Sequence, residues 1–187
     1  MSDQSLTPSL LLAMPQLDDA NFSRAVVLLC KYSDEGALGF IVNRPIDTVT
    51  SRMVVFDPPL RSETSLTIWE GGPVSQERGW LLCRVRPEGD DGLTICEGLY
   101  MSSSQALLRQ ILDGDSRETE PDRSRLLLGY AGWGPGQLDR ELAASAWLTV
   151  PLDVKLVFDT PPEELWEKAI RTLGVDPAAI APAPGVH

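Results

Sequence analysis

The apolar residues of this chain come in short runs of strand length, each closed by glycine, proline or small polar residues. Leucine-rich or β-branched runs bounded by turn residues are typical of β-strands. In chain order, the predicted strands are SLLLAM, AVVLLCKY, ALGFIVN, SLTIW, GWLLCRV, LTIC, RLLLGYA, AWLTV and VKLVF. No run approaches the roughly 20 apolar residues that span a bilayer.

Helix signals appear in three segments of the second half. Ser102 and Gln105 have the spacing of a capping box, and Gly114 suits the end of the helix that follows them. A second helix is expected after the turn at residues 134–136, where proline is flanked by glycines.

The third predicted helix has the clearest ends. Thr160 is expected to cap it, Pro161 to occupy its first turn and Gly174 to stop it. Its apolar residues recur at helical spacing and are expected to face the core: Leu165, Trp166, Ala169, Ile170 and Leu173.

These elements predict the fold class and the domain organisation. Strands dominate the first half of the 187 residues and helices collect in the second. This order favours an α+β or layered α/β sandwich, with a mixed or antiparallel sheet and about three main helices. We expect a single domain over residues 1–175 and a flexible tail over residues 176–187, where proline and alanine offer little to bury.

The charge of the chain argues against direct binding to nucleic acid. It has 16 Lys and Arg against 27 Asp and Glu, for a formal net charge of −11. Basic groups supply most non-specific affinity for DNA, and no run of them marks a basic face. The same net charge disfavours anionic membrane surfaces.

The N-terminus and the cysteines favour the cytoplasm. The sequence MSDQSLTP lacks the positive start of a secretory signal. Cys30, Cys83 and Cys96 are an odd number and form no C-x-x-C motif, although their spacing does not exclude one oxidised pair. We expect free thiols that act as small buried hydrophobic side chains.

The sequence lacks the internal histidine that many catalytic sites require, whereas Ser-Lys and paired-carboxylate mechanisms stay open. Its only histidine, His187, is the last residue, which disfavours Ser-His-Asp and Cys-His mechanisms and zinc sites built on imidazoles. We therefore predict no catalytic residue, metal site or cofactor. A small-molecule binder or an unrecognised enzyme remains the alternative, with Asp18, Asp19 and Glu141 as acid–base groups.

The stretch GYAGWGPGQLDREL, residues 129–142, is rich in glycine and precedes a predicted helix. Its spacing matches neither common phosphate-binding motif, and it contains no lysine. We interpret it as a rigid turn, with Tyr130 in the core and with Trp133 either in the core or partly exposed, since its glycine neighbours are too small to cover it. An ion pair between Arg24 and Glu141 could fix this corner.

Several motifs together carry a family resemblance. In order, LLAMPQLDDANFSRAV, GALGFIVNRP, GGPV, RGW, GYAGWGPGQLDREL and AWL resemble the YqgE/AlgH family of bacterial proteins, over residues 10–175. The resemblance implies an α/β sandwich in the cytoplasm with no established enzymatic activity. Some members carry a transcriptional-regulator label, which for this acidic chain would mean an indirect effect through a partner.

This sequence departs from the family pattern at two histidines. Many members have Cys-Glu-His where this chain has Cys30, Lys31 and Tyr32, and a second common histidine is replaced near Cys83 and Arg84. A function that used those histidines elsewhere cannot operate that way in this chain.

The leading hypothesis is a non-enzymatic interaction or regulatory protein that contacts a protein partner. Rigid aromatic residues beside glycines suit a contact surface, because they lose little entropy on binding. The alternative hypothesis places a small-molecule site in the same cleft. Asn43, one of the cleft residues, could instead cap a local turn. The predicted cleft comprises Met14, Pro15, Phe22, Asn43, Pro45, Gly72, Pro73, Tyr130, Trp133 and Gln137.

Overall fold

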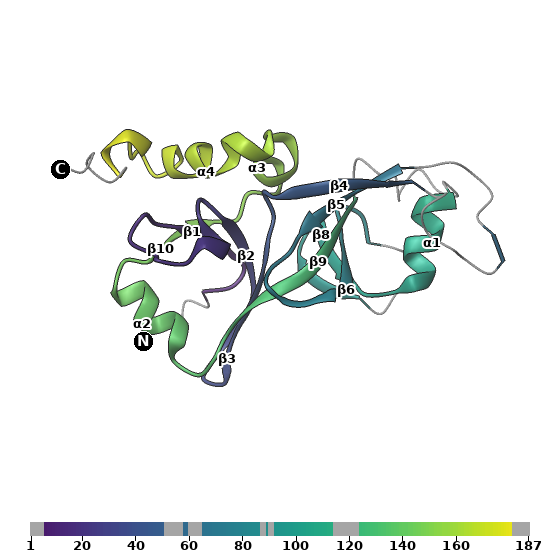
Figure 1. Cartoon of the computed structure of the whole chain (residues 1–187), viewed down its shortest axis with the longest axis horizontal. Helices are drawn as coiled ribbons and strands as arrows, with labels where there is room; N and C mark the ends of the chain where they lie inside the picture. The colour runs from purple at the N-terminus through teal and green to yellow at the C-terminus, as the bar shows by residue number, and fades with distance from the viewer. Residues whose placement is uncertain are drawn as a thin grey trace. The chain divides into compact units, whose positions relative to one another are not determined.

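The computed structural model describes residues 6–50, 58–59, 65–86, 89, 92–113 and 124–180 (Figure 1). The fold is mixed α+β, as the sequence predicts. The chain divides into a terminal unit, residues 1–44 with 131–187, and a middle unit, residues 45–130. The single domain expected over residues 1–175 stays a prediction.

The terminal unit is built on an antiparallel sheet with the strand order β10-β1-β2-β3-β9. Residues 131–133 of β9 pair with β3 at its edge. The strands are β1 (Ser9–Ala13), β2 (Val26–Ser33), β3 (Gly36–Ile41), β9 (Ser124–Trp133) and β10 (Trp147–Pro151).

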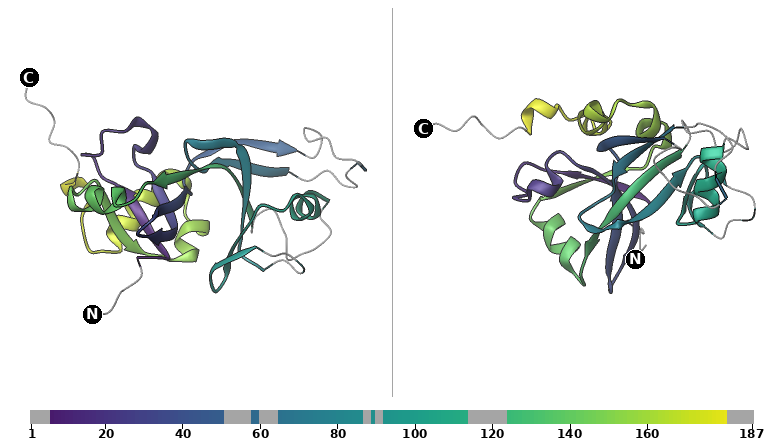
Figure 2. Two further views of the ribbon diagram at one scale, coloured as in Figure 1. Left: turned by 90° about the horizontal axis from the view of Figure 1, so that it is seen from below. Right: turned by 45° about the vertical axis from the view of Figure 1, so that its right-hand side comes forward.

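Two helices of this unit lie on opposite sides of the sheet (Figures 1 and 2). Leu138 of α2 packs with Leu11 and Val27 on one face. On the other side, Trp166 of α4 donates its indole N–H to the carbonyl of Ala13, at 2.9 Å. The helical segments are α2 (Gln137–Ala143), α3 (Val154–Asp159), α4 (Pro162–Arg171) and the 3-10 turns η1 (Ala20–Phe22) and η4 (Pro177–Ala179).

The middle unit has a second sheet with the order β4-β5-β9-β6-β8-β7, in which β5 and β9 are parallel and the other pairs antiparallel. Leu107 and Ile111 of helix α1 (Gln105–Asp113) pack on Leu81 of this sheet. The strands specific to this unit are β4 (Pro45–Thr50), β5 (Ser65–Glu70), β6 (Val74–Cys83), β7 (Leu93–Cys96) and β8 (Leu99–Ser102).

Some elements differ from those predicted from the sequence. The predicted strand VKLVF is helix α3, because the side chain of Asp153 caps it by accepting from the backbone N–H groups of Lys155 (2.9 Å) and Leu156 (3.2 Å). Strands β4 and β8 were not predicted. The first begins at a proline, and the second is only four residues long. Both features weaken a strand pattern.

The ends of the predicted helices also differ in detail. Ser104, rather than Ser102, caps α1, since its hydroxyl accepts from the N–H of Leu107 at 3.2 Å. Pro161 is the N-cap of α4, while Thr160 ends α3. Leu173 is 39% exposed and therefore lies outside the apolar face of α4. The predicted stop at Gly114 lies outside the described residues.

The region of the predicted tail begins with an ordered turn. Asp176 accepts from the N–H of Ala178 at 3.0 Å and caps η4, in which Pro177 is buried. Residues 181–187 lie outside the described part of the chain. Among the described residues, no helix is long and apolar enough to cross a membrane.

Candidate functional site

The glycine-rich corner of the terminal unit is organised by one carboxylate, that of Glu141. Its Oε2 accepts from the indole N–H groups of Trp133 (2.9 Å) and Trp147 (2.7 Å). Its Oε1 accepts from the amide of Gln137 at 2.9 Å, and the oxygen of that amide accepts from the N–H of Gly134 at 3.0 Å. The corner is therefore held in one shape by side chains, which agrees with a rigid turn.

Of the two alternatives for Trp133, the structure shows the core position, because its side chain is only 6% exposed. Residues that are distant in sequence shield the Trp133 side chain from solvent. Phe22 stacks on it with ring centroids 6.5 Å apart, and Trp147 meets it edge-on at 5.7 Å. Small sequence neighbours thus do not predict exposure when remote aromatics fill the space. Tyr130, which was expected in the core, is only half-buried.

The ion pair considered between Arg24 and Glu141 does not form. Arg24 pairs instead with Glu167 of α4, at 3.1 Å. The oxygens of Glu141 are already occupied by the neutral donors of the corner.

The loop between β1 and β2 is fixed by Asn43 and Arg44, which lie between β3 and β4. Asn43 accepts from the N–H of Val26 at 2.9 Å and donates to the carbonyl of Arg24 at 3.0 Å. Arg44 donates to the carbonyl of Ser23 at 2.8 Å. Arg24 is held at φ 52°, a conformation that costs energy for a residue with a side chain. Asn43 therefore has a structural role in a distant turn, rather than a role as a free contact residue.

Replacing Asn43 with alanine is expected to lower the free energy of unfolding by about 2 kcal/mol, because two hydrogen bonds to the loop backbone are lost. Urea unfolding measures this change. Asn21→Ala is the matched control, since this exposed side chain makes no hydrogen bond within the described residues. Equal stability of the two variants would contradict the clamp.

The clamped loop borders a groove of about 550 Å³, which we call the loop groove. Trp166 of α4 forms part of it, although Trp166 and Ala13 are 153 residues apart in sequence. The residues that line the groove include Met14, Pro15, Leu17, Asp18, Arg24 and Trp166.

The loop groove combines an apolar floor with a charged rim. Met14 and Trp166 are largely buried, whereas Asp18 and Arg24 are exposed. The guanidinium of Arg24 lies 4.9 Å from the centre of the Trp166 ring, in cation–π geometry. Within the described ranges, no group of three or more His, Cys, Asp or Glu residues could hold a metal ion.

The ten residues of the predicted cleft fall in both units. Met14 and Pro15 line the loop groove, while Phe22, Trp133 and Asn43 support its loop or the adjoining corner. The residues in the terminal unit are Met14, Pro15, Phe22, Asn43, Trp133 and Gln137, and those in the middle unit are Pro45, Gly72, Pro73 and Tyr130. A common cleft formed by all ten stays a prediction.

Sequence reasoning missed other residues of the groove. The helical spacing of Trp166 predicts a core position, and the structure confirms it. The same side chain also lines the groove. Leu17, Ala20 and Pro177 carry no signal of their own. These residues could be identified only if it were known that the loop between β1 and β2 lies near α4.

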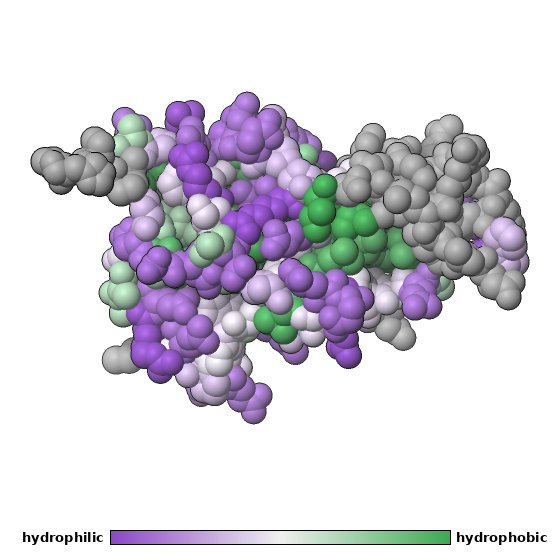
Figure 3. Space-filling model, viewed as in Figure 1, coloured by the Kyte–Doolittle hydropathy of each residue, from purple (hydrophilic) through white to green (hydrophobic). Residues whose placement is uncertain are grey.

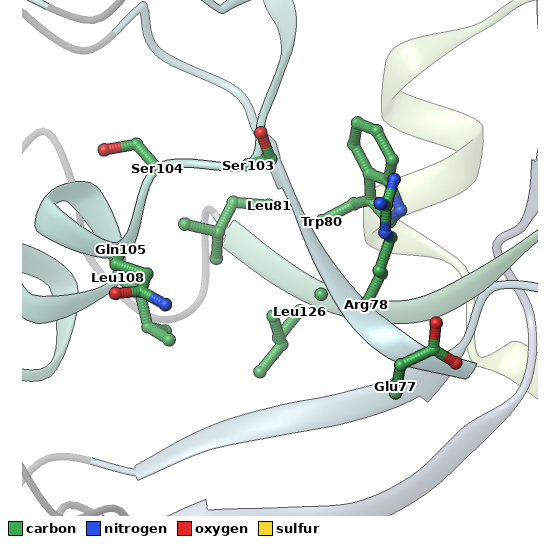
Figure 4. A pocket seen from close by; sticks show the side chains of 10 residues that line it. Glu77, Arg78, Trp80, Leu81, Ser103, Ser104, Gln105, Leu108 and Leu126 are labelled. Carbon is green, nitrogen blue, oxygen red and sulfur yellow. The ribbon is translucent and has the colours of Figure 1, made fainter. Parts of the chain in front are cut away.

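The middle unit contains a second cavity, of about 410 Å³, beside strand β6 and the start of α1. Leu81, Leu108 and Leu126 point toward a common space, and Arg78 and Ser103 lie at its edge (Figure 4). Apolar atoms also gather over the strands of this unit on one face (Figure 3). Apolar concave surfaces with a few polar groups are typical of ligand sites.

The cysteines are free thiols in different environments. Cys83 is buried, as expected, and its sulfur lies 3.6 Å from the hydroxyl of Ser124, which donates to it. Cys30 and Cys96 keep some exposed surface, so full burial is observed for Cys83 alone, although the Cys30 thiol is largely desolvated. Burial raises the pKa of Cys30 to about 12, and burial followed by the charge of Glu97 raises the pKa of Cys96.

Cys30 is therefore expected to react slowly with alkylating reagents at pH 8. A pKa of about 12 in place of 9.0 leaves roughly a thousandfold less of the reactive thiolate. Mass spectrometry of iodoacetamide-treated protein, native and in urea, measures the two rates. Labelling of native Cys30 at the rate of the unfolded chain would contradict this prediction.

Comparison with known proteins confirms the family resemblance seen in the sequence. The model of the AlgH-like family (DUF179) matches residues 10–178. A UPF0301 protein of Photobacterium profundum is 36% identical over 184 residues, covering 95% of this chain and 96% of that protein. A UPF0301 protein of Nitrosococcus oceani is 39% identical over 170 residues, covering 89% and 88%.

Two solved structures are similar over most of the chain. The solution structure of the AlgH protein from Pseudomonas aeruginosa aligns with a TM-score of 0.73 at 33% identity, covering 100% of this chain and 98% of that one. The crystal structure of protein DIP2367 from Corynebacterium diphtheriae aligns at 0.66 and 21% identity, covering 89% and 86%, and shows a shared fold. The chain belongs to the AlgH-like family.

Proposed function

We propose that this protein is a non-enzymatic interaction protein that binds a partner protein through the loop groove. The observation that carries the proposal is an exposed loop whose backbone is held by distant side chains. Asn43 and Arg44 hold the carbonyls of Arg24 and Ser23, so the loop is ordered before any partner arrives. Pre-ordering of this kind lowers the entropy cost of binding.

The chemistry of the groove favours binding over catalysis. Its titratable residues are Asp18, Asp19 and Arg24, and the carboxylate of Asp19 already accepts from the N–H of Asn21 at 2.9 Å. The described residues that line the groove include no histidine, lysine or tyrosine that could complete an acid–base pair with these carboxylates. We therefore assign the groove to recognition.

The proposal includes a cytoplasmic location and an indirect influence on gene expression. A net charge of −11 disfavours direct contact with DNA, so any such influence would pass through the partner. Loss of partner binding should then alter transcription without any change in DNA binding by this chain.

Blocking the groove tests the proposal. Ala20 is exposed and lines the groove, so Ala20→Arg should fill it without removing a core side chain. Ala143→Arg is the matched control, because Ala143 is exposed on α2 and does not line the groove. Each folded variant is used to capture proteins from the native bacterium, with quantification by mass spectrometry.

The expected result is a partner retained by the wild type and by Ala143→Arg, and reduced about tenfold or more by Ala20→Arg. Equal capture by all three proteins, or no capture by the wild type, would contradict the proposal.

A second candidate function is small-molecule binding in the leucine-lined cavity of the middle unit. The observation that favours it is the convergence of Leu81, Leu108 and Leu126 on a space of about 410 Å³ (Figure 4). This place differs from the cleft that the sequence suggested. Native mass spectrometry of protein purified from its own bacterium should show an added mass, and Leu126→Ala should reduce it. A spectrum with the protein mass alone would reject this candidate.

A further inference from the structure

We propose that the partner segment bound in the loop groove is an extended peptide with an apolar side chain next to a lysine or arginine. This inference rests on the proposed function, because it specifies the chemistry of the partner at the same groove. The apolar side chain would contact the floor, and the basic group would contact the carboxylate of Asp18 on the rim.

The floor of the groove suits an apolar side chain. Met14 and Trp166 offer a thioether and an indole, and Leu17 is half-buried beside them. The backbone carbonyl of Ala13 already accepts from the Trp166 indole N–H, so this floor offers apolar surface rather than a free polar group. Aromatic and methionine side chains of this kind are common at the centres of interfaces.

The rim has an excess of negative charge. The cation that lines the groove, Arg24, is matched by Glu167 at 3.1 Å. Asp18 is exposed and has no basic partner among the described residues, and Asp19 contacts a backbone N–H. A basic partner group would therefore meet an unmatched carboxylate, which favours rapid and specific association.

Other occupants fit these charges less well. A second copy of this chain would bring another net charge of −11 to an acidic rim. The chain's own C-terminal residues, APAPGVH, contain no lysine or arginine. A basic segment of a different protein is therefore the occupant that the charges favour.

Selection from a phage-displayed library of random peptides of about 12 residues, with the whole protein as bait, tests this inference. The most enriched peptide is then synthesised with a fluorescent label, and its Kd is measured by anisotropy. The proteins compared are the wild type, Asp18→Lys, Ala20→Arg and the control Asp34→Lys. The control makes the same charge change at an exposed turn outside the groove.

The enriched peptides are expected to carry Lys or Arg beside an apolar residue. Asp18→Lys should raise the Kd about tenfold or more, while Asp34→Lys should leave it within about twofold. The Kd of the wild type should also rise with salt, because the charges are exposed.

The outcomes that overturn the proposals are distinct. Suppose that the enriched peptides lack basic residues and bind Asp18→Lys as well as the wild type, but lose binding to Ala20→Arg. This result would contradict the proposal of a basic partner segment and would leave the groove as a binding site. Equal effects of Asp18→Lys and Asp34→Lys would do the same. Enrichment of no peptide, or only of peptides that tolerate Ala20→Arg, would overturn the proposed function as well.

Discussion

Replacement of Glu141 with alanine is expected to lower the free energy of unfolding by about 3 kcal/mol. Its carboxylate accepts the indole N–H groups of Trp133 and Trp147, and both tryptophans are buried. Their N–H groups would lose this acceptor and remain desolvated, which is costly. Urea unfolding followed by tryptophan fluorescence measures the loss, since these indoles report directly on the corner.

Two variants serve as controls for this prediction. Glu141→Gln keeps one carbonyl acceptor and should cost about 1 kcal/mol. Glu163→Ala removes an exposed carboxylate from the first turn of α4 and should cost less than about 1 kcal/mol. If Glu141→Ala were no less stable than Glu163→Ala, the carboxylate would not be what holds the corner.

The second large effect is expected at Gly129 in the middle unit. Its φ is +72°, and a Cβ there would lie 2.4 Å from the carbonyl oxygen of Gly72 and 2.8 Å from that of Val74. Both obstacles are backbone atoms, which cannot move aside as a flexible side chain can. Gly129→Ala should therefore cost about 4 kcal/mol or more, measured as a fall in the midpoint of thermal unfolding or as loss of soluble protein.

Gly98→Ala separates the steric clash from the backbone conformation. Gly98 has a similar φ of +79°, but a Cβ there would meet nothing within 4 Å. Only the cost of the left-handed conformation applies, about 1 kcal/mol. Equal destabilisation by the two substitutions would show that the close approach of Gly129 to Gly72 is not important.

The sequence predicted the elements whose signals are local. The leucine-rich runs of β1 and β2 are strands. Of the glycine-rich stretch, only residues 134–136 form the turn before α2, because residues 129–133 are the end of strand β9. VKLVF was misassigned because an apolar run of this length does not distinguish a strand from a short helix. The cap at Asp153 was the signal that could have decided it.

The roles of the motif residues depend on contacts distant in sequence, which local patterns do not encode. Phe22 covers Trp133, and Asn43 fixes the backbone at Arg24. These residues were expected to form the contact surface itself. In the structure they hold other parts of the terminal unit in place, and the exposed side chains belong to the loop that they support.

The same observation explains why the loop groove was only partly predicted. Met14 and Pro15 were chosen because they end the first strand, and both line the groove. Trp166 reaches it from α4, at the far end of the sequence. A helix pattern identifies which side chains are apolar, but not which loop covers them.

The loop groove is the surface through which we propose that this protein binds its partner. The most direct measurement places a photo-crosslinking amino acid at Ala20 or at Ala143 in the native bacterium and identifies the adducts by mass spectrometry. We expect a specific protein adduct from position 20, on the groove, and none from position 143, on α2. The same adducts from both positions, or an adduct from position 143 alone, would contradict it.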